Sequence, residues 1–120
     1  MRVLLAGAAG FVGRIALDLL GERHEVTAFD IRAVEGYTNV VEGDVLDYAA
    51  VAAAVEGHDA VVNTIMAPNP TYGSNGPRFT VNVSGVFNLL EAARAHGIEL
   101  LCTPRVGRCT RDICSRPRRF

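Results

Sequence analysis

The chain has 120 residues, of which 49% are hydrophobic, and a formal net charge of −1. A chain of this length buries roughly two-thirds of its unfolded surface, so one domain with a modest core is expected. No uncharged run reaches the ~20 residues that a bilayer span needs, and the three cysteines lack the paired C-x-x-C spacing of zinc sites. We therefore expect a cytoplasmic protein with no membrane segment and no metal site.

Strands and helices are predicted to alternate along the chain. Residues 2–6 form an apolar run of strand length, and apolar residues at helical spacing follow from Phe11 until Gly21. Short β-branched or apolar runs predict four more strands, at Glu25–Asp30, Asn39–Glu42, Ala60–Asn63 and Glu99–Cys102. Two more helices are predicted, over Tyr48–Val55 with Asp47 as its cap and over Phe79–His96 after a loop at Ala67–Pro77.

The order of these elements predicts the fold class. Strands that read as unbroken apolar runs are buried on both faces, which is typical of a parallel sheet with helices on either side. We therefore predict an α/β, Rossmann-like, doubly wound parallel sheet of about five strands in the order 3-2-1-4-5. This sheet would be truncated after the fifth strand.

The stretch GAAGFVG, residues 7–13, places three glycines between the first strand and the first helix. In this setting Gly7 permits a tight turn, Gly10 lets a pyrophosphate approach the backbone, and Gly13 lets the helix pack close to the sheet. The anion would lie at the helix N-terminus, where unpaired N–H groups and the helix dipole favour negative charge. The pattern predicts a dinucleotide-binding turn.

Asp30 follows Gly10 by twenty residues, at the predicted end of the second strand. An acidic side chain there accepts hydrogen bonds from the hydroxyls of the adenosine ribose. The alternative is a solvated acid at a strand end. A carboxylate would repel a 2′-phosphate, so NAD is expected to be preferred, whereas Arg32 nearby favours NADP.

Four motifs in this order resemble one protein family. They are AGAAGFVG with Asp30 at the strand end, GDVLD at residues 43–47, DAVVN at 59–63 and VNVSGVFNLLEAAR at 81–94. Over about residues 1–101 the chain resembles the extended short-chain dehydrogenase/reductases, the NAD-dependent epimerase/dehydratase group. The resemblance implies a cofactor-binding half of such an enzyme.

The resemblance also implies roles for individual residues. Phe11 and Val12 would approach the pyrophosphate through their backbone, and Asp44 with Val45 would hold the adenine edge. The alternative for Asp44 is an ordinary turn residue, and both interpretations stay open.

Another implied contact lies after the fourth strand. The segment Thr64–Pro68 would line the cofactor, with Asn82 near it. Ile65 and Met66 depart from the small residues that the family commonly has here, so contacts along this segment are an open question. The alternative for Asn82 is an ordinary polar position on a helix.

Enzymes of this family transfer a hydride between a substrate carbon and the nicotinamide, with a tyrosine as general acid/base and a lysine that lowers its pKa. The chain contains no lysine and no tyrosine after Tyr72, so no catalytic residue is assigned and the chain is expected to be inactive alone. Two hypotheses follow. One is the cofactor-binding half of an epimerase, dehydratase or dehydrogenase acting on a nucleotide-sugar or related hydroxyl substrate. The other is a non-catalytic dinucleotide-binding or redox-sensing module.

The end of the chain differs from the rest. Residues 104–120 hold six arginines and one acidic residue, and the resemblance stops after Leu101. We expect residues 1–103 to form the incomplete NAD(P)-binding domain, followed by a basic, disordered tail that binds no specific nucleic acid. Reading the codons one nucleotide earlier after Leu101 permits a family-like continuation, so a frameshift is our hypothesis for this tail. Self-association into a homo-oligomer is left open.

Overall fold

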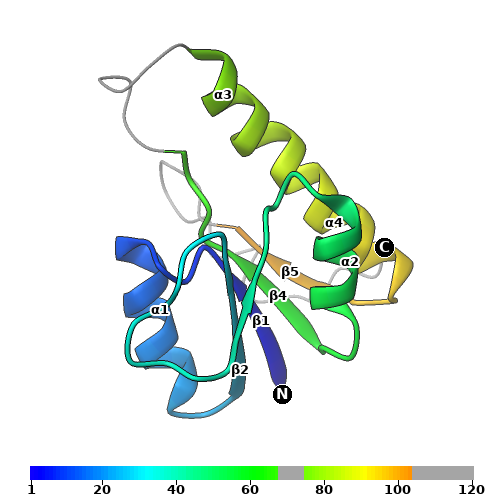
Figure 1. The fold of residues 1–120 in the computed structure, drawn as a ribbon. Coiled ribbons are helices and arrows are strands. Elements are labelled where there is room, and N and C mark those ends of the chain that lie inside the picture. Colours follow the sequence, from blue (N-terminus) through cyan, green and yellow to red (C-terminus); the bar gives the residue numbers. More distant parts are fainter. Residues whose placement is uncertain (68–74, 104–120) are drawn as a thin grey trace.

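The computed structural model describes residues 1–67 and 75–103, which form a five-stranded parallel sheet with helices on both faces (Figure 1). The strand order is β3-β2-β1-β4-β5, as predicted. The strands are β1 (Arg2–Ala6), β2 (Glu25–Asp30), β3 (Val40–Glu42), β4 (Ala60–Asn63) and β5 (Leu100–Cys102). The predicted α/β doubly wound fold is confirmed.

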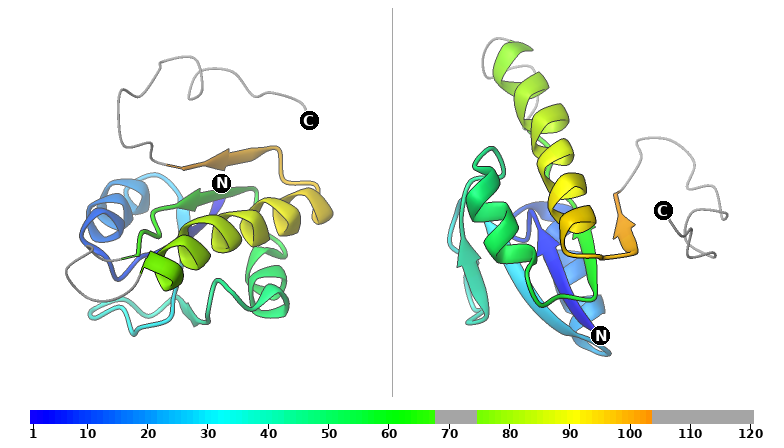
Figure 2. Two further views of the ribbon diagram at one scale, coloured as in Figure 1. Left: turned by 90° about the horizontal axis from the view of Figure 1, so that it is seen from above. Right: turned by 90° about the vertical axis from the view of Figure 1, so that its right-hand side faces the viewer.

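The central strands are apolar throughout because both of their faces are buried. Leu4 belongs to a core cluster that β1 shares with α2 (Tyr48–Val55) and α4 (Val86–Ala95). The next residue, Leu5, belongs to a second cluster that includes Leu17 of α1 (Phe11–Gly21). Successive side chains of a strand point to opposite faces, so one run of leucines supplies both cores. Figure 2 shows α1 on one face of the sheet and α2 with α4 on the other.

Asp47 caps α2, as the sequence predicted. Its side chain accepts hydrogen bonds from the backbone N–H groups of Ala49 (3.0 Å) and Ala50 (3.3 Å), which have no partner within the helix. The cap fixes where the chain turns from the loop after β3 into α2. That loop, residues 43–47, borders the site described below.

The long helix differs from the prediction in its start and in its winding. It was expected to begin at Phe79, but α3 (Asn75–Phe79) already starts four residues earlier, so the predicted loop is wrong at residues 75–77. Pro77 lies in the first turn, where a missing N–H breaks no helical hydrogen bond. The segment η2 (Thr80–Gly85) then has π-helical winding before α4 continues the helix.

Smaller differences concern the edges of the sheet. β3 and β5 each begin one residue later than predicted, at Val40 and Leu100. Residues 68–74 of the predicted loop and the whole basic tail at 104–120 lie outside the described residues. Within the described part, no helix has the length and apolar character needed to cross a membrane.

Candidate functional site

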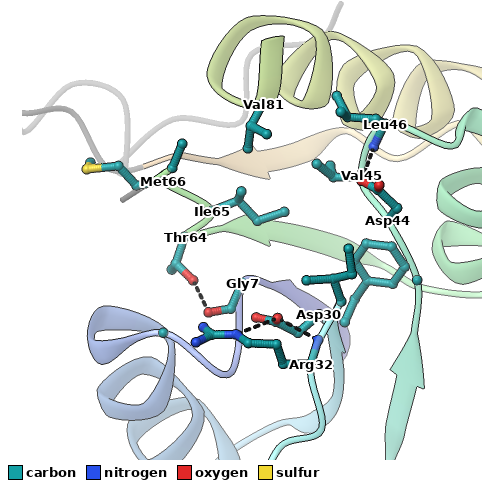
Figure 3. Close-up of a pocket in the computed structure, with 15 residues that line it drawn as sticks. Gly7, Asp30, Arg32, Asp44, Val45, Leu46, Thr64, Ile65, Met66 and Val81 are labelled. Atoms are coloured by element: carbon teal, nitrogen blue, oxygen red, sulfur yellow. Dashed lines mark hydrogen bonds and ion pairs between the residues drawn. The ribbon is translucent and has the colours of Figure 1, made fainter. Parts of the chain in front are cut away.

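A pocket of about 480 Å³ opens at the carboxyl ends of β1, β2 and β4 (Figure 3). In open parallel sheets this edge, near the point where the strand order reverses, is where ligands bind. The pocket lies between the turn after β1, the end of β2, the loop after β3 and the segment after β4. Seven of the predicted site residues line it: Gly7, Gly10, Asp30, Arg32, Asp44, Val45 and Thr64. Four do not: Phe11, Val12, Gly13 and Asn82.

The fold itself requires two of the three glycines in the turn. Gly7 has a φ of +86°, and a Cβ there would lie 2.6 Å from the backbone nitrogen of Ile65. A Cβ at Gly13 would overlap the carbonyl oxygen of Gly7, so the first turn of α1 packs directly on the end of β1. These contacts agree with the roles that the sequence predicted for the two residues.

Gly10 is different, because packing constrains it less. A Cβ at Gly10 would meet only the carbonyl oxygen of Gly7, at 3.3 Å, and the residue borders the pocket. The missing side chain of Gly10 therefore leaves room for a ligand in the pocket, whereas Gly7 and Gly13 leave room for other atoms of the protein.

Next to Gly10, the start of α1 carries donors without acceptors. Gly10 is the N-cap and provides no side-chain hydrogen bond. Among the described residues, the backbone N–H groups of Phe11, Val12 and Gly13 donate to no protein acceptor. The Phe11 side chain is 84% exposed, so the backbone of this residue is its available contact. A helix N-terminus of this kind suits an anion.

The carboxylate of Asp30 bridges the end of β2 and the glycine turn. One oxygen accepts a hydrogen bond from the backbone N–H of Ala9 (3.0 Å) and the other from that of Arg32 (3.0 Å). The residue is only 7% exposed, and these bonds satisfy its buried carboxylate. The Arg32 guanidinium lies 3.6 Å from the same carboxylate, and its side chain is 67% exposed. An ionised carboxylate has about four acceptor positions, so capacity for ligand hydroxyls remains.

The opposite rim of the pocket is the loop after β3. Asp44 accepts a hydrogen bond from the backbone N–H of Leu46 (2.9 Å), which is the turn role that the sequence left as an alternative. It also lines the pocket, so the turn does not exclude a ligand contact. Val45 is buried, whereas Asp44 is exposed. Figure 3 shows both residues across the pocket from Asp30 and Arg32.

The segment after β4 forms the floor between these rims. The Thr64 hydroxyl shares its one hydrogen between the carbonyl oxygens of Ala6 (2.8 Å) and Gly7 (3.1 Å), so it ties this segment to the glycine turn. Ile65 and Met66, the bulky departures from the family pattern, both line the pocket. Asn82 does not, but its Oδ1 accepts from the Ala67 N–H (2.9 Å) and holds the segment from the side of η2.

Two asparagines that position the site were missed by the sequence analysis. Asn63 is buried at the end of β4, where its amide accepts from the Ile65 N–H (3.0 Å) and donates to the Thr103 hydroxyl (3.3 Å). Asn88 donates to the carbonyl oxygen of Val45 (2.9 Å). The available signal was a polar residue inside the two apolar motifs DAVVN and VFNLLEAA.

Metal ligands are a separate question from this pocket. Within residues 1–67 and 75–103, no three His, Cys, Asp or Glu side chains gather in a way that could hold a metal ion.

Comparisons with known proteins agree with this geometry. The L-arabinose 1-dehydrogenase (NAD(P)(+)) of Haloferax volcanii is 40% identical over 100 residues, which are 83% of this chain and 39% of that protein. The uronate dehydrogenase of Pseudomonas putida is 35% identical over 105 residues, 82% of this chain and 38% of its own length. The chain thus spans well under half the length of these relatives.

Solved structures and a family profile extend the comparison. A short-chain dehydrogenase/reductase superfamily protein from Agrobacterium tumefaciens, crystallised with bound NAD, matches with a TM-score of 0.78 and 30% identity over 86% of this chain and 32% of that one. The profile of the family described as NAD(P)H-binding matches residues 7–110. The chain therefore belongs to the NAD(P)H-binding family and corresponds to the cofactor-binding domain of the extended short-chain dehydrogenase/reductases, the NAD-dependent epimerase/dehydratase group.

Proposed function

We propose that the pocket binds a nicotinamide adenine dinucleotide, with NAD preferred over NADP. The observation that carries the proposal is the Asp30 carboxylate, which lies at the end of β2 and is hydrogen-bonded to the glycine turn through the Ala9 N–H (3.0 Å). A carboxylate in this place accepts hydrogen bonds from the ribose hydroxyls. The ribose would then lie next to the diphosphate, because the Ala9–Asp30 hydrogen bond joins the glycine turn to the end of β2.

The diphosphate is assigned to the start of α1. The N–H groups of Phe11, Val12 and Gly13 would donate to it, and Gly10 would let it approach the main chain. Thr64 would act indirectly, since its hydroxyl already holds the Ala6 and Gly7 carbonyls. The contacts of Phe11, Val12 and Gly13 with the diphosphate would all come from the backbone, so the proposal does not depend on their side chains.

The adenine is assigned to the opposite rim, at Asp44 and Val45. Asp30 would repel the 2′-phosphate of NADP, which supports the preference for NAD. Arg32 is the residue that would favour NADP, but its guanidinium lies 3.6 Å from Asp30 and is partly neutralised there. Asn82 would support the site through Ala67.

The chemistry of the whole protein is a further part of the proposal. The relatives are named as dehydrogenases acting on L-arabinose and uronate and as a dTDP-glucose dehydratase. We assign residues 1–103 to the cofactor-binding domain of such an enzyme, with a sugar, nucleotide-sugar or related hydroxyl compound as substrate. When bound, the nicotinamide would supply hydride transfer. The domain would bind and orient it, and residues 104–120 would lie outside the domain.

A second candidate is a non-catalytic dinucleotide-binding module. The specific observation in its favour is that the described pocket is lined without a tyrosine or a lysine, so dinucleotide binding by itself needs neither. The two candidates are separated by sequencing the locus beyond the codon for Leu101. A family-like continuation with a tyrosine and a lysine four residues apart supports the enzyme. A verified frame without one supports the binding module.

Calorimetric titration of the purified chain with NAD and with NADP tests the binding proposal. We expect NAD to bind more tightly, and Asp30→Asn to weaken NAD binding by roughly tenfold to a hundredfold, since hydrogen bonds to a charged group contribute about 1.5–3 kcal/mol. Asp47→Asn is the matched control, because asparagine caps a helix as well as aspartate does. Absence of NAD binding by a folded chain would contradict the proposal. Equal loss of affinity in both variants would contradict the role of Asp30.

A further inference from the structure

Asn88 of α4 holds the loop that forms the adenine-side rim. Its Nδ2 donates to the carbonyl oxygen of Val45 at 2.9 Å, across 43 residues of sequence. Val45 itself is only 6% exposed, so this bond lies in a partly buried environment where water competes weakly. The rim is therefore fixed from a helix outside the pocket lining.

A second contact reaches the same residue from the end of η2. Gly85 lies three residues before Asn88, and a Cβ there would come within 2.7 Å of Cγ1 of Val45. The valine side chain thus packs on bare backbone at the junction of η2 and α4, while its carbonyl oxygen accepts from Asn88. Backbone and side chain of Val45 are both held, which leaves this position of the loop little freedom.

These contacts leave two polar groups of the rim available for a ligand. Asp44 uses Oδ1 for the Leu46 N–H, so Oδ2 remains as an acceptor. In the described part of the chain, the Val45 N–H donates to no protein acceptor. One acceptor and one donor on neighbouring residues complement the amino group and the N1 atom of adenine, and they oppose the oxygen and the N1–H of hypoxanthine.

We propose that Asn88 is a positioning residue for recognition of the base, and that it sets the preference of the site for adenine over hypoxanthine. The proposal rests on the dinucleotide site assigned above. Asn88 touches no ligand in this account. It acts by holding the Val45 carbonyl in place. This contact would keep the Val45 N–H and the Asp44 carboxylate in the orientation in which they bond to N1 and the amino group of adenine.

The test compares two asparagines that make the same kind of bond. Asn88→Asp replaces the donor with an acceptor facing the Val45 carbonyl. The matched control is Asn39→Asp, because the Asn39 amide also donates to a backbone carbonyl oxygen, that of Val26, at 2.8 Å. Neither Asn39 nor Val26 lines the pocket. The affinities of the purified 120-residue chain for NAD and for nicotinamide hypoxanthine dinucleotide are measured by calorimetry, below the unfolding temperature of each variant.

We expect the wild type and Asn39→Asp to prefer NAD, and Asn88→Asp to lose roughly tenfold of that preference, the equivalent of one hydrogen bond. A purely structural role would lower the stability of both variants and leave the ratio of affinities unchanged. If Asn88→Asp fails to fold, Asn88→Ala takes its place with the same expectation.

The outcomes separate the two proposals. A wild-type chain that binds no NAD overturns the dinucleotide site and this inference with it. A wild-type chain that binds NAD with no preference over the hypoxanthine analogue, or an Asn88 variant that keeps the full preference, overturns only the role of Asn88.

Discussion

The two rims of the pocket are held in place by different means. The glycine turn is held by the backbone conformation of Gly7 and the close packing of Gly13 against the Gly7 carbonyl, and by hydrogen bonds with Asp30 and Thr64 at the ends of the neighbouring strands. The loop at residues 43–46 is fixed from a distance, by Asn88 and Gly85 on the long helix. One rim is held by its own backbone and by the ends of the strands beside it, whereas the other depends on a helix some forty residues later in the chain.

This difference predicts where a single change acts on folding and where it acts on binding. A substitution in the turn whose added atoms clash with the protein should reduce the free energy of unfolding. A substitution whose added atoms mainly enter the pocket should reduce the affinity for NAD and change the free energy of unfolding less. The predictions below follow this division from the largest expected effect to the smallest.

Gly13→Ala should give the largest loss of stability. The added methyl group would overlap the Gly7 carbonyl, and overpacking of this kind costs up to about 3 kcal/mol. Chemical denaturation measures the change in the free energy of unfolding. Gly21→Ala is the matched control in the same helix, because a Cβ there meets no atom within 4 Å. We expect the control to be neutral or slightly stabilising, and equal losses in both variants would contradict the local packing of the turn.

Gly10→Ala should separate binding from folding. Its Cβ would meet only the Gly7 oxygen, at 3.3 Å, and would otherwise enter the pocket. We expect a fall of roughly tenfold in NAD affinity, about 1.4 kcal/mol, with a smaller change in unfolding free energy. Calorimetry and denaturation of the same preparation measure both. Unchanged affinity would show that the diphosphate does not approach this backbone.

Thr64→Val tests the link between the floor of the pocket and the turn. The substitution keeps the side-chain shape but removes the hydroxyl that donates to Ala6 and Gly7, so we expect a loss of about 1 kcal/mol of stability. Thr38→Val, at an exposed position, is the control and should change stability much less. Similar values for the two variants would mean that the hydroxyl does not hold the turn.

The smallest effect is expected at the amino end of β1, far from both rims. The backbone N–H of Arg2 (2.7 Å from the carboxylate) and then its guanidinium lower the pKa of Asp59. A lowered folded-state pKa contributes stability that is present above the unfolded value of about 3.9 and is lost as the pH falls through the folded value. Asp59→Asn should remove that part of the acid dependence of unfolding and leave NAD affinity unchanged. An identical acid profile in the variant would contradict this role.

The sequence was informative where one residue type solves a local problem. The strands, the cap at Asp47, the positive φ of Gly7 and the packing of Gly13 follow from periodicity and short-range geometry, and the strand order follows from the doubly wound fold class that these elements indicate. Asp30 could be placed beside the turn because parallel strands bring their carboxyl ends to one edge. These predictions needed no knowledge of distant contacts.

The sequence was less informative where partners lie far apart in the chain. Asn63 and Asn88 interrupt apolar motifs, and the groups that their amides donate to lie 40 and 43 residues away, although Asn63 also accepts from the nearby Ile65 N–H. The early start of the long helix was hidden by the proline and glycine content of residues 75–77, and the π-helical winding of η2 has no periodic signature. The adenine-side rim was therefore predicted only through resemblance.

The central claim is that the diphosphate of the cofactor binds at the start of α1. The most direct measurement follows the backbone amide signals of the isotope-labelled chain by NMR during titration with NAD. The account predicts that the amides of Phe11, Val12 and Gly13 shift most strongly and saturate together with the calorimetric binding curve. Saturation by NAD with these three signals unmoved would contradict it.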